Sequence, residues 1–500
     1  MVKQAAGRVH EAAARAEELA TGPLATLRLL LLTAQSLQDI VATGQPRLVT
    51  PPRIAHREAG SVVASVVELE LLPARGMRDG VIFQGHKATV RCANPGSIAV
   101  FLEMWRQECA TRPRSGGVAV VLGAGNVTGL AVADAICQIF EYGRAAIVKL
   151  HPAHEPLVNV LREALAPLVD AGLVTFIVGG TDIAREAVAT DAVTHVHLTG
   201  GAAAFAAVAA STTKPITCEL GNVTPWFIMP GRYTRAQLRF QADTIAASIA
   251  NNTSFNCIAT KLIVTCRSWD QRDEFLGLIR CRLAALPPRP AWYPGASTLW
   301  EEITGRVAPG DGTLPWVFRE GLHADVDEAW ITREWFVPVA GELPLAAADI
   351  EAFCGQAAAL ALRLPGSLAA SVTVPEYLST RDAARAGLLV EHLPFGVVGR
   401  NCWSALAYSM ASIPWGGYPG GTRSDPKSGI GFVHDPLLLP LVHNSIIRGP
   451  LAARLTPPWF PWHTHGAMLA EGLIDMYAAI ARGNSGLWQL ARMLPAVLRG

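Results

Sequence analysis

Hydrophobic and polar positions alternate through the middle of the chain in a regular order of short and long segments. Short, largely apolar runs occur at Val118–Leu122 and Ala145–Lys149, and a longer segment with helical spacing follows each of them, at 130–142 and 155–171. Runs of this length are typical of strands buried on both faces of a sheet. Strands that alternate with helices of this size predict βαβ units and a parallel sheet covered by helices.

The same alternation continues to about residue 433. We expect further strands at 173–178, 195–198 and 258–266, and further helices at 181–189, 234–250 and 270–286. Ahead of this region, the pattern predicts helix over 1–45, short strands within 60–95 (including 81–83) and a helix over 96–110. The tail from 434 to 500 is rich in Leu, Pro and Trp, and its spacing predicts amphipathic helices at 466–482 and 486–498.

Composition narrows the classes of function. The chain has 500 residues, of which 50% are hydrophobic and 17% charged, and its net charge of +1 comes from 42 basic and 41 acidic residues. This length indicates several domains, and the balanced charge gives no electrostatic basis for a nucleic-acid partner. Because the nine cysteines contain no CxxC pair, we expect neither a disulfide framework nor a zinc site. A reducing, cytoplasmic compartment fits this cysteine usage best.

Three features bear on membranes and metals. The charged N-terminus lacks the apolar core of a signal peptide. The uncharged window 116–133 could span a bilayer by length, but its glycines favour a strand, a turn and a helix start, so we expect no transmembrane span. The Trp-rich segment 459–462 leaves peripheral membrane association open, although a packed arm is the simpler expectation. His463 and His465 lack a third ligand, so we expect no metal site.

Five short motifs follow one another along the chain. They are G-A-G-N-V-T-G at 123–129, C-E-L-G-N-V-T-P at 218–225, N-N-T-S-F-N-C-I-A-T at 251–260, E-W-F-V-P-V at 334–339 and P-W-G-G-Y-P-G-G-T-R-S-D-P-K-S-G-I-G at 414–431. The first only half fits a dinucleotide fingerprint, because its third glycine is displaced and Lys149, rather than an acid, ends the next strand. Cys257 alone is weak evidence, since a free cysteine is most often a small buried hydrophobe.

In this order, the motifs resemble those of the aldehyde dehydrogenase superfamily over residues 115–433. The resemblance implies an α/β fold with a Rossmann-type parallel-sheet nucleotide-binding domain and an α/β catalytic domain. We expect an N-terminal helical segment and NAD(P)-binding domain over 1–229, a catalytic domain carrying Cys257 over 230–433, and a Trp/Pro-rich helical extension over 434–500.

The resemblance also implies roles for individual residues. Cys257 is expected to attack the aldehyde carbon as a thiolate, Asn126 to donate to the oxyanion, and Glu219 to activate the water that cleaves the thioester. The expected cofactor contacts are Lys149, Thr199, Gly200, Gly201, Leu220, Glu334 and Phe336. Taken singly, each residue is better explained as a turn residue, a cap or a core side chain; their common order favours a site.

Several positions depart from the family pattern. Pro152 stands where the family has an acid for the adenine ribose, so the cofactor is NAD or NADP. Ser254 and Phe255 replace the Gly-Gln ahead of the family cysteine, and Gly201 replaces a serine. No dimerising hairpin is evident just ahead of residue 117, which leaves a homo-oligomer open.

The expected function is NAD(P)-dependent oxidation of an aldehyde to a carboxylic acid through a cysteine thioester. Two other functions stay open. One is CoA-linked acyl transfer, in a CoA-acylating aldehyde dehydrogenase or an acyl-CoA reductase. The other is a catalytically weak nucleotide-binding scaffold of the same fold.

Overall fold

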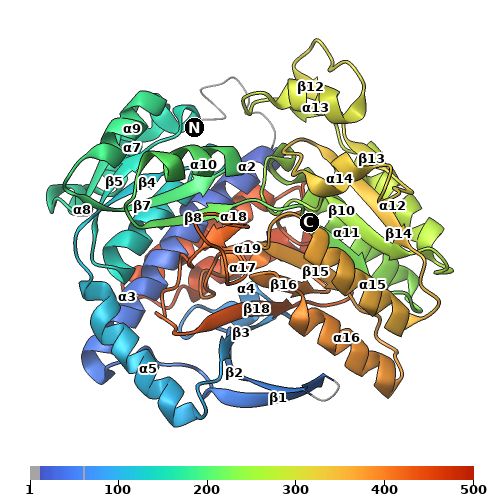
Figure 1. The fold of residues 1–500 in the computed structure, drawn as a ribbon, viewed down its shortest axis with the longest axis horizontal. Helices are drawn as coiled ribbons and strands as arrows, with labels where there is room; N and C mark the ends of the chain where they lie inside the picture. Colours follow the sequence, from blue (N-terminus) through green and yellow to red (C-terminus); the bar gives the residue numbers. More distant parts are fainter. Residues whose placement is uncertain (1–11, 60–61, 500) are drawn as a thin grey trace.

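Two β-sheets and the helices around them form the protein (Figure 1). A computed structural model of the chain describes residues 12–59 and 62–499. The smaller sheet has six strands in the order β17 (Gly429–Ile430), β8 (Ile216–Leu220), β7 (Val193–Gly200), β4 (Val118–Leu122), β5 (Ala145–Lys149) and β6 (Val174–Ile177). All neighbours are parallel except β17, which runs antiparallel to β8.

Helices cover both faces of this sheet. They are α6 (Leu130–Ile136), α7 (Val158–Ala164), α8 (Ala166–Asp170), α9 (Thr181–Ala189) and α10 (Ala202–Ser211). On β4, Val120 belongs to the apolar cluster that contains residues of α9 and α10, whereas Val121 belongs to the cluster that contains residues of α6 and α7. Because successive side chains of a strand point to opposite faces, this alternation confirms the parallel sheet buried on both sides that the apolar run predicts.

The larger sheet has ten strands and carries the second half of the chain. Its order is β1 (Arg53–Ala59), β2 (Val62–Leu72), β3 (Lys87–Ala93), β18 (Val442–Arg448), β16 (Val397–Arg400), β15 (Ala369–Thr373), β9 (Pro225–Ile228), β10 (Leu262–Cys266), β14 (Val339–Leu345) and β13 (Val317–Arg319). The strands from β18 to β13 pair in parallel, and β1, β2 and β3 extend the sheet as antiparallel strands.

The helices of the second half begin with α11 (Arg235–Ala250). The others are α12 (Arg272–Ala284), α13 (Ala296–Thr304), α14 (Glu328–Thr332), α15 (Ile350–Arg363), α16 (Thr380–His392) and α17 (Leu406–Met410), and a short ribbon pairs β11 (Arg289–Pro290) with β12 (Thr313–Leu314). The mixed α/β fold with parallel sheets therefore confirms the predicted fold class.

Two predicted elements are wrong in detail. The strand predicted at 81–83 is instead the short helix α4 (Asp79–Ile82), because the buried Asp79 accepts hydrogen bonds from the Ala74 N–H and from Arg28. The helix predicted at 155–171 is divided into a 3₁₀ turn and the helices α7 and α8. Pro156 and Pro167 lie at the two divisions, where a proline lacks the N–H that a continuous helix needs.

The N-terminal helix lies along the smaller sheet's helical layer (Figure 1). It comprises α2 (Ala12–Leu19), a π-helical turn and α3 (Ala25–Thr43), and it confirms the predicted helix within the described residues; 1–11 lie outside them. By length and composition alone, Ala12–Thr43 could cross a membrane. However, its buried Arg28 forms an ion pair with Asp79 and donates to Tyr477, as expected for a helix packed in a protein interior.

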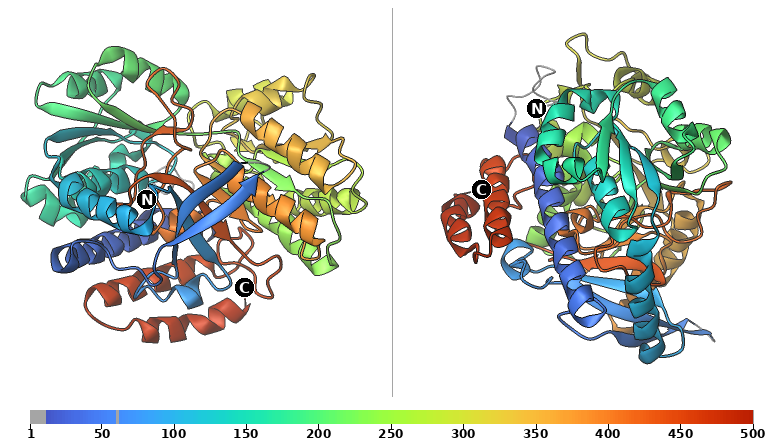
Figure 2. Two further views of the ribbon diagram at one scale, coloured as in Figure 1. Left: turned by 60° about the horizontal axis from the view of Figure 1, so that its bottom comes forward. Right: turned by 90° about the vertical axis from the view of Figure 1, so that its left-hand side faces the viewer.

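The tail confirms the two predicted helices, α18 (Gly466–Ala481) and α19 (Leu487–Arg499), which form a hairpin on the outside of the molecule (Figure 2). Gly472 makes this hairpin close, because a methyl group there would lie 2.4 Å from the Met493 sulfur. The Trp-rich segment ahead of it is a packed arm. Trp459 lies 5.0 Å from Trp403 between ring centroids, and the Arg282 guanidinium lies 4.4 Å from the Trp462 ring centroid.

Candidate active site around Cys257

Cys257 lies in a tight connection between α11 and β10. After α11 ends at Ala250, the consecutive residues Asn252, Thr253 and Ser254 all have positive φ, at 52°, 58° and 63°. Each left-handed residue of this kind costs about 1–2 kcal/mol, so a run of three must be held by its surroundings. Backbone strain of this sort gathers at functional sites.

Side-chain hydrogen bonds hold this strained connection. The buried Lys261 ammonium donates to the backbone oxygen and hydroxyl of Ser254, at 3.2 and 2.6 Å. The Asn252 amide donates to the backbone oxygens of Asn126 and Phe255, both at 2.9 Å. The Asn126 amide in turn donates to Phe255 at 3.2 Å. The turn after β4 is therefore tied to the segment that carries Cys257. Because an asparagine amide has two N–H donors, Asn126 keeps one beyond its bond to Phe255.

Two buried carboxylates lie near the sulfur of Cys257. Cys257 is half-buried, and burial of its thiol raises the thiol pKa well above the usual range. The charges of Glu219 and Glu334 raise this pKa further. Interactions of this kind require proximity. The thiol is thus protonated at neutral pH, so it needs a base that removes its proton before it can act as a nucleophile.

Glu219 has the properties of such a base. It lies near the end of β8, and burial together with the Asp134 carboxylate raises its pKa to about 7, although His434 and a hydrogen bond from Trp415 oppose the rise. The Trp415 indole N–H donates to Oε1. Oε2 is buried and has no hydrogen-bond partner among the described residues. One oxygen therefore fixes the carboxylate while the other is left to accept a proton.

Glu334 is the second carboxylate, in the segment between α14 and β14. Burial raises its pKa to about 8, opposed by the Lys261 ammonium. Its Oε1 is buried without a hydrogen-bond partner among the described residues. The carboxylate lies directly against Gly221, where Oε2 would be 2.0 Å from any added Cβ. This glycine of the second motif therefore lets Glu334 approach the end of β8.

A buried polar network lies behind Glu219, and sequence reasoning missed it. Asp134 on α6 accepts from the Thr199 hydroxyl at 2.8 Å and pairs with the His434 Nε2 at 3.0 Å. His197 Nε2 lies 3.6 Å from the same carboxylate. Burial alone would raise the pKa of Asp134, but the interactions with His197 and His434 outweigh it and hold this pKa well below the usual range. A lone acid in the apolar helix L-A-V-A-D-A-I was the signal that could have found it.

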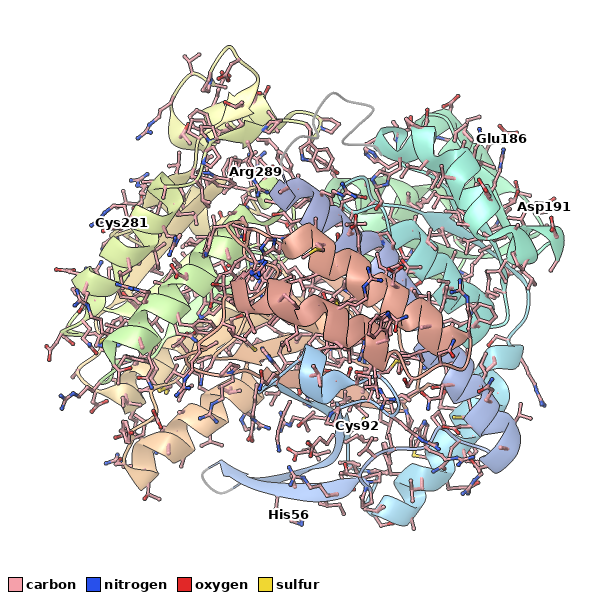
Figure 3. All side chains as sticks on the ribbon, turned by 180° about the vertical axis from the view of Figure 1, so that it is seen from behind. His56, Cys92, Glu186, Asp191, Cys281 and Arg289 are labelled. Atoms are coloured by element: carbon pink, nitrogen blue, oxygen red, sulfur yellow. The ribbon has the colours of Figure 1, made fainter. Side chains whose placement is uncertain are left out.

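This network makes a stability prediction. Replacing Asp134 with alanine should destabilise the protein by about 3–5 kcal/mol, because it removes the buried carboxylate with which the Thr199 hydroxyl and the His434 ring are paired. A lower midpoint of urea unfolding would measure the loss. Asp191→Ala is the control, since Asp191 is exposed on the surface (Figure 3) and should change stability by less than about 0.5 kcal/mol. Equal midpoints for the two variants would contradict the prediction.

The residues expected to hold a dinucleotide lie at the ends of neighbouring parallel strands. Lys149 ends β5, Gly200 ends β7 and Leu220 ends β8. Gly201 precedes α10, whose first turn is exposed and whose leading N–H groups have no partners within the helix. Ligands of open α/β sheets bind at these carboxyl ends. The Leu220 N–H is occupied by the Ser428 oxygen at 2.9 Å.

These features fit a dinucleotide. The Glu334 oxygen without a partner among the described residues suits a ribose hydroxyl, and the open start of α10 suits a phosphate. Burial lowers the pKa of the Lys149 amine, and the charges of Glu155 and Asp182 oppose this shift. Phe336, expected beside the nicotinamide, packs 5.1 Å from Tyr293 and 6.2 Å from Phe255 between ring centroids. An aromatic wall therefore borders this side of the site.

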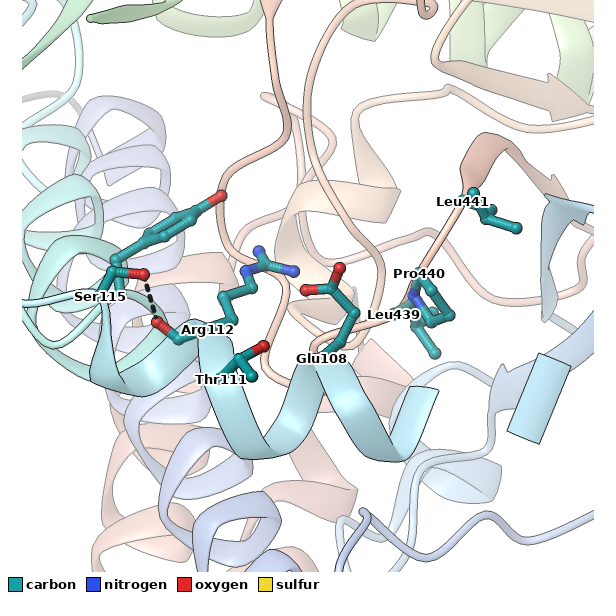
Figure 4. Close-up of a pocket in the computed structure, with 8 residues that line it drawn as sticks. Glu108, Thr111, Arg112, Ser115, Leu439, Pro440 and Leu441 are labelled. Atoms are coloured by element: carbon teal, nitrogen blue, oxygen red, sulfur yellow. Dashed lines mark hydrogen bonds between the residues drawn. The ribbon is translucent and has the colours of Figure 1, made fainter. Parts of the chain in front are cut away.

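One surface hollow lies away from these residues. This surface hollow of about 440 Å³ lies between α5 (Ile98–Thr111) and residues 439–441, lined in part by Glu108 and Arg112 (Figure 4). Arg112 forms ion pairs with Glu141 and Asp435, which anchor the chain next to His434. None of the residues that line this hollow belongs to the five motifs. Within the described part of the chain, no group of three or more potential metal ligands occurs.

Comparisons with known proteins bear on the fold and on the sequence resemblance. Residues 87–289 match the sequence profile of the Aldehyde dehydrogenase family. No curated protein matches the chain. Among solved structures, AldH of Staphylococcus aureus in its substrate-bound state has a TM-score of 0.55 at 15% identity, covering 88% of this chain and 83% of that one.

Two further structures are similar at the same level. Succinic semialdehyde dehydrogenase of Streptococcus pyogenes, in complex with NADP⁺, has a TM-score of 0.54 at 16% identity, covering 87% of this chain and 89% of that one. An indole-3-acetaldehyde dehydrogenase complexed with NAD⁺ has a TM-score of 0.53 at 16% identity, covering 87% and 84%. At such identities the likeness establishes the fold. The chain thus has the fold of these aldehyde dehydrogenases, and its residues 87–289 also resemble the family in sequence.

Proposed function

We propose that this protein oxidises an aldehyde to a carboxylic acid with NAD or NADP, through a thioester on Cys257. One observation carries the proposal: Glu219, whose charge raises the pKa of the Cys257 thiol, has a buried Oε2 without a hydrogen-bond partner among the described residues. The profile match of residues 87–289 and the cofactors in the crystal structures of similar fold support it.

Glu219 begins the reaction by taking the proton of the Cys257 thiol onto its open Oε2. The sulfur then attacks the aldehyde carbon, and the carbonyl oxygen becomes an oxyanion. The second N–H of the Asn126 amide and the backbone N–H of Cys257 donate to this oxygen. A dinucleotide, when bound by the residues named below, would supply the hydride acceptor that oxidation of this adduct to a thioester requires.

Hydrolysis of the thioester returns the enzyme to its starting state. Glu219 passes its first proton to solvent and then removes one from a water molecule, whose oxygen attacks the acyl carbon. The carbon–sulfur bond breaks, the carboxylic acid leaves, and the sulfur regains a proton. In the same proposal, Glu334 holds a ribose hydroxyl of the dinucleotide, Lys149 its adenosine end, and the turn of Thr199, Gly200 and Gly201 its phosphates.

The direct test is an absorbance assay for reduced nicotinamide. Purified protein is mixed with NAD or NADP and a panel of short, long and aromatic aldehydes, with and without CoA. We expect aldehyde-dependent reduction of one cofactor and release of a free acid without CoA. If turnover depended strictly on CoA, the acyl acceptor would be CoA instead of water. No turnover with either cofactor would refute the proposed function.

Trp415 provides a prediction about pH. Because its hydrogen bond lowers the pKa of Glu219, Trp415→Phe should raise that pKa above its value of about 7. Glu219 must be deprotonated to act, so kcat/KM rises with pH through this pKa. The rising limb of the variant should move to alkaline pH by about one unit, the worth of a hydrogen bond to a charged group.

A second indole serves as the control. Trp300→Phe also removes a buried indole N–H donor, but this one donates to the backbone oxygen of Pro315, between β12 and β13. Its pH profile should match that of the unmodified protein. An unchanged profile for Trp415→Phe, at normal stability, would contradict the assignment of Glu219 as the titrating base.

A further inference from the structure

Helix α19 has an apolar face on each side. Met493 and Ala496 are buried against α18, where they form a small apolar cluster with Leu469. The opposite face points to solvent. There Leu487, Leu494 and Leu498 recur at the i, i+7 and i+11 spacing that places side chains on one stripe of a helix. A helix that served only to cover its partner would be polar on this outer face.

The outer stripe is among the most exposed apolar surface of the described chain. Leu487 and Leu494 are each 56% exposed, Leu498 is 63% exposed, and the neighbouring Trp488 is 70% exposed. Ala491 and Pro495 lie between them and are exposed as well. Together the four large side chains present on the order of 500 Å² of apolar surface, a patch of the size that marks interaction sites on monomers.

Charge indicates what covers this stripe. From residue 476 to the end of the chain there is no aspartate or glutamate, while Arg482, Arg492 and Arg499 are all exposed. Arg492 and Arg499 follow Trp488 around the helix, so they border the apolar stripe on one side. An apolar face bordered by tryptophan and arginine matches a bilayer surface with anionic headgroups, where leucines enter the acyl boundary and arginines reach the phosphates.

A second copy of the chain fits the stripe less well. Two such patches would bury on the order of 1,000 Å² in total, below the roughly 1,200–2,000 Å² of a stable interface. Pairing would also bring the arginines of both copies together without a carboxylate from this segment. The position of the hairpin on the outside of the molecule leaves the stripe free to meet a flat surface (Figure 2).

We propose that α19 lies in the surface of an anionic lipid bilayer and docks the protein on it through Leu487, Trp488, Leu494 and Leu498. This docking is peripheral, since the other face of the same helix stays packed on α18. It is also separate from catalysis, because none of these residues belongs to the site around Cys257.

Vesicle flotation of the full-length protein tests the proposal. We expect it to float with vesicles of phosphatidylcholine and phosphatidylserine, and less with phosphatidylcholine alone or at high salt. Leu494→Glu with Leu498→Glu should lower the partition coefficient at least about 100-fold, because two buried leucines are lost. Arg492→Gln should lower it roughly fivefold, the contribution of one cation at an anionic surface.

Leu362→Glu is the matched control, since Leu362 is an exposed leucine on α15. It should float like the unmodified protein. Thermal unfolding shows whether the double variant has kept its fold; if it has not, Arg492→Gln and the salt dependence decide the test. No flotation of the unmodified protein would overturn the proposal, and so would flotation that Leu494→Glu with Leu498→Glu leaves unchanged. A doubled mass without lipid that the leucine variant abolishes would assign the stripe to a second copy instead.

Discussion

Cys257→Ala is expected to lower aldehyde-dependent reduction of NAD(P) by at least about 10³-fold, because no other group can form the carbon–sulfur bond. Steady-state kinetics at saturating cofactor measures the effect. Stability should change little, since the side chain loses only its sulfur and is half-buried. Binding of the dinucleotide, followed by fluorescence, should persist, because the residues proposed to hold it lie in other segments of the chain than Cys257.

The chain supplies its own control for this experiment. Cys281 is a free cysteine exposed on α12 (Figure 3), and Cys281→Ala should leave kcat and KM unchanged. The same two variants show which cysteine a thiol-directed inhibitor has to alkylate. The inhibitor should still inactivate Cys281→Ala, whereas Cys257→Ala has no activity left to inhibit. Turnover by Cys257→Ala close to that of the unmodified protein would end the proposed mechanism.

Glu219→Gln is expected to have the second largest effect. Without the general base, steady-state turnover should fall about 10²–10³-fold, and the rise of kcat/KM through about pH 7 should disappear, since this is the pKa of the buried carboxyl. The amide keeps the size of the side chain and still accepts the Trp415 hydrogen bond at its oxygen. Rapid-mixing kinetics should show slower formation of one reduced cofactor per site, because water has to take the thiol proton, followed by still slower hydrolysis of the thioester.

Chemical rescue identifies the step that Glu219 serves. Hydroxylamine attacks thioesters without a general base, so it should restore turnover of Glu219→Gln and yield a hydroxamate, but it should not restore Cys257→Ala. Glu186→Gln, at an exposed position on α9 (Figure 3), should behave like the unmodified protein. Failure of hydroxylamine to raise the turnover of Glu219→Gln would contradict a role of Glu219 in thioester hydrolysis.

Local sequence pattern predicted much of the fold. The strands β4 and β5 and the helix α9 have the predicted bounds, because a run buried on both faces and an amphipathic helix are each encoded within a few residues. The sheet order was not predictable in this way. The residues after 428 return to pair with both sheets, β17 with β8 and β18 with β3, and these two pairs join residues hundreds of positions apart.

The candidate site shows the same division. Motif order indicated Cys257, Glu219 and Asn126, and the structure ties Asn126 and Glu219 to the surroundings of Cys257. It did not indicate Asp134 or His434, since each is a single polar residue whose partner lies far along the chain. Nor could it indicate which apolar face of α19 is covered, because helical period alone does not tell a packed face from an exposed one.

The central claim is that aldehyde oxidation passes through a thioester on Cys257. It is tested most directly by quenching Glu219→Gln in acid during its first turnover and measuring the mass of the protein and its peptides. We expect one acyl group on the peptide that contains Cys257 for each cofactor molecule reduced. The corresponding peptide of Cys257→Ala should carry no acyl group. Reduced cofactor without an acyl adduct, or an adduct on another cysteine, would contradict it.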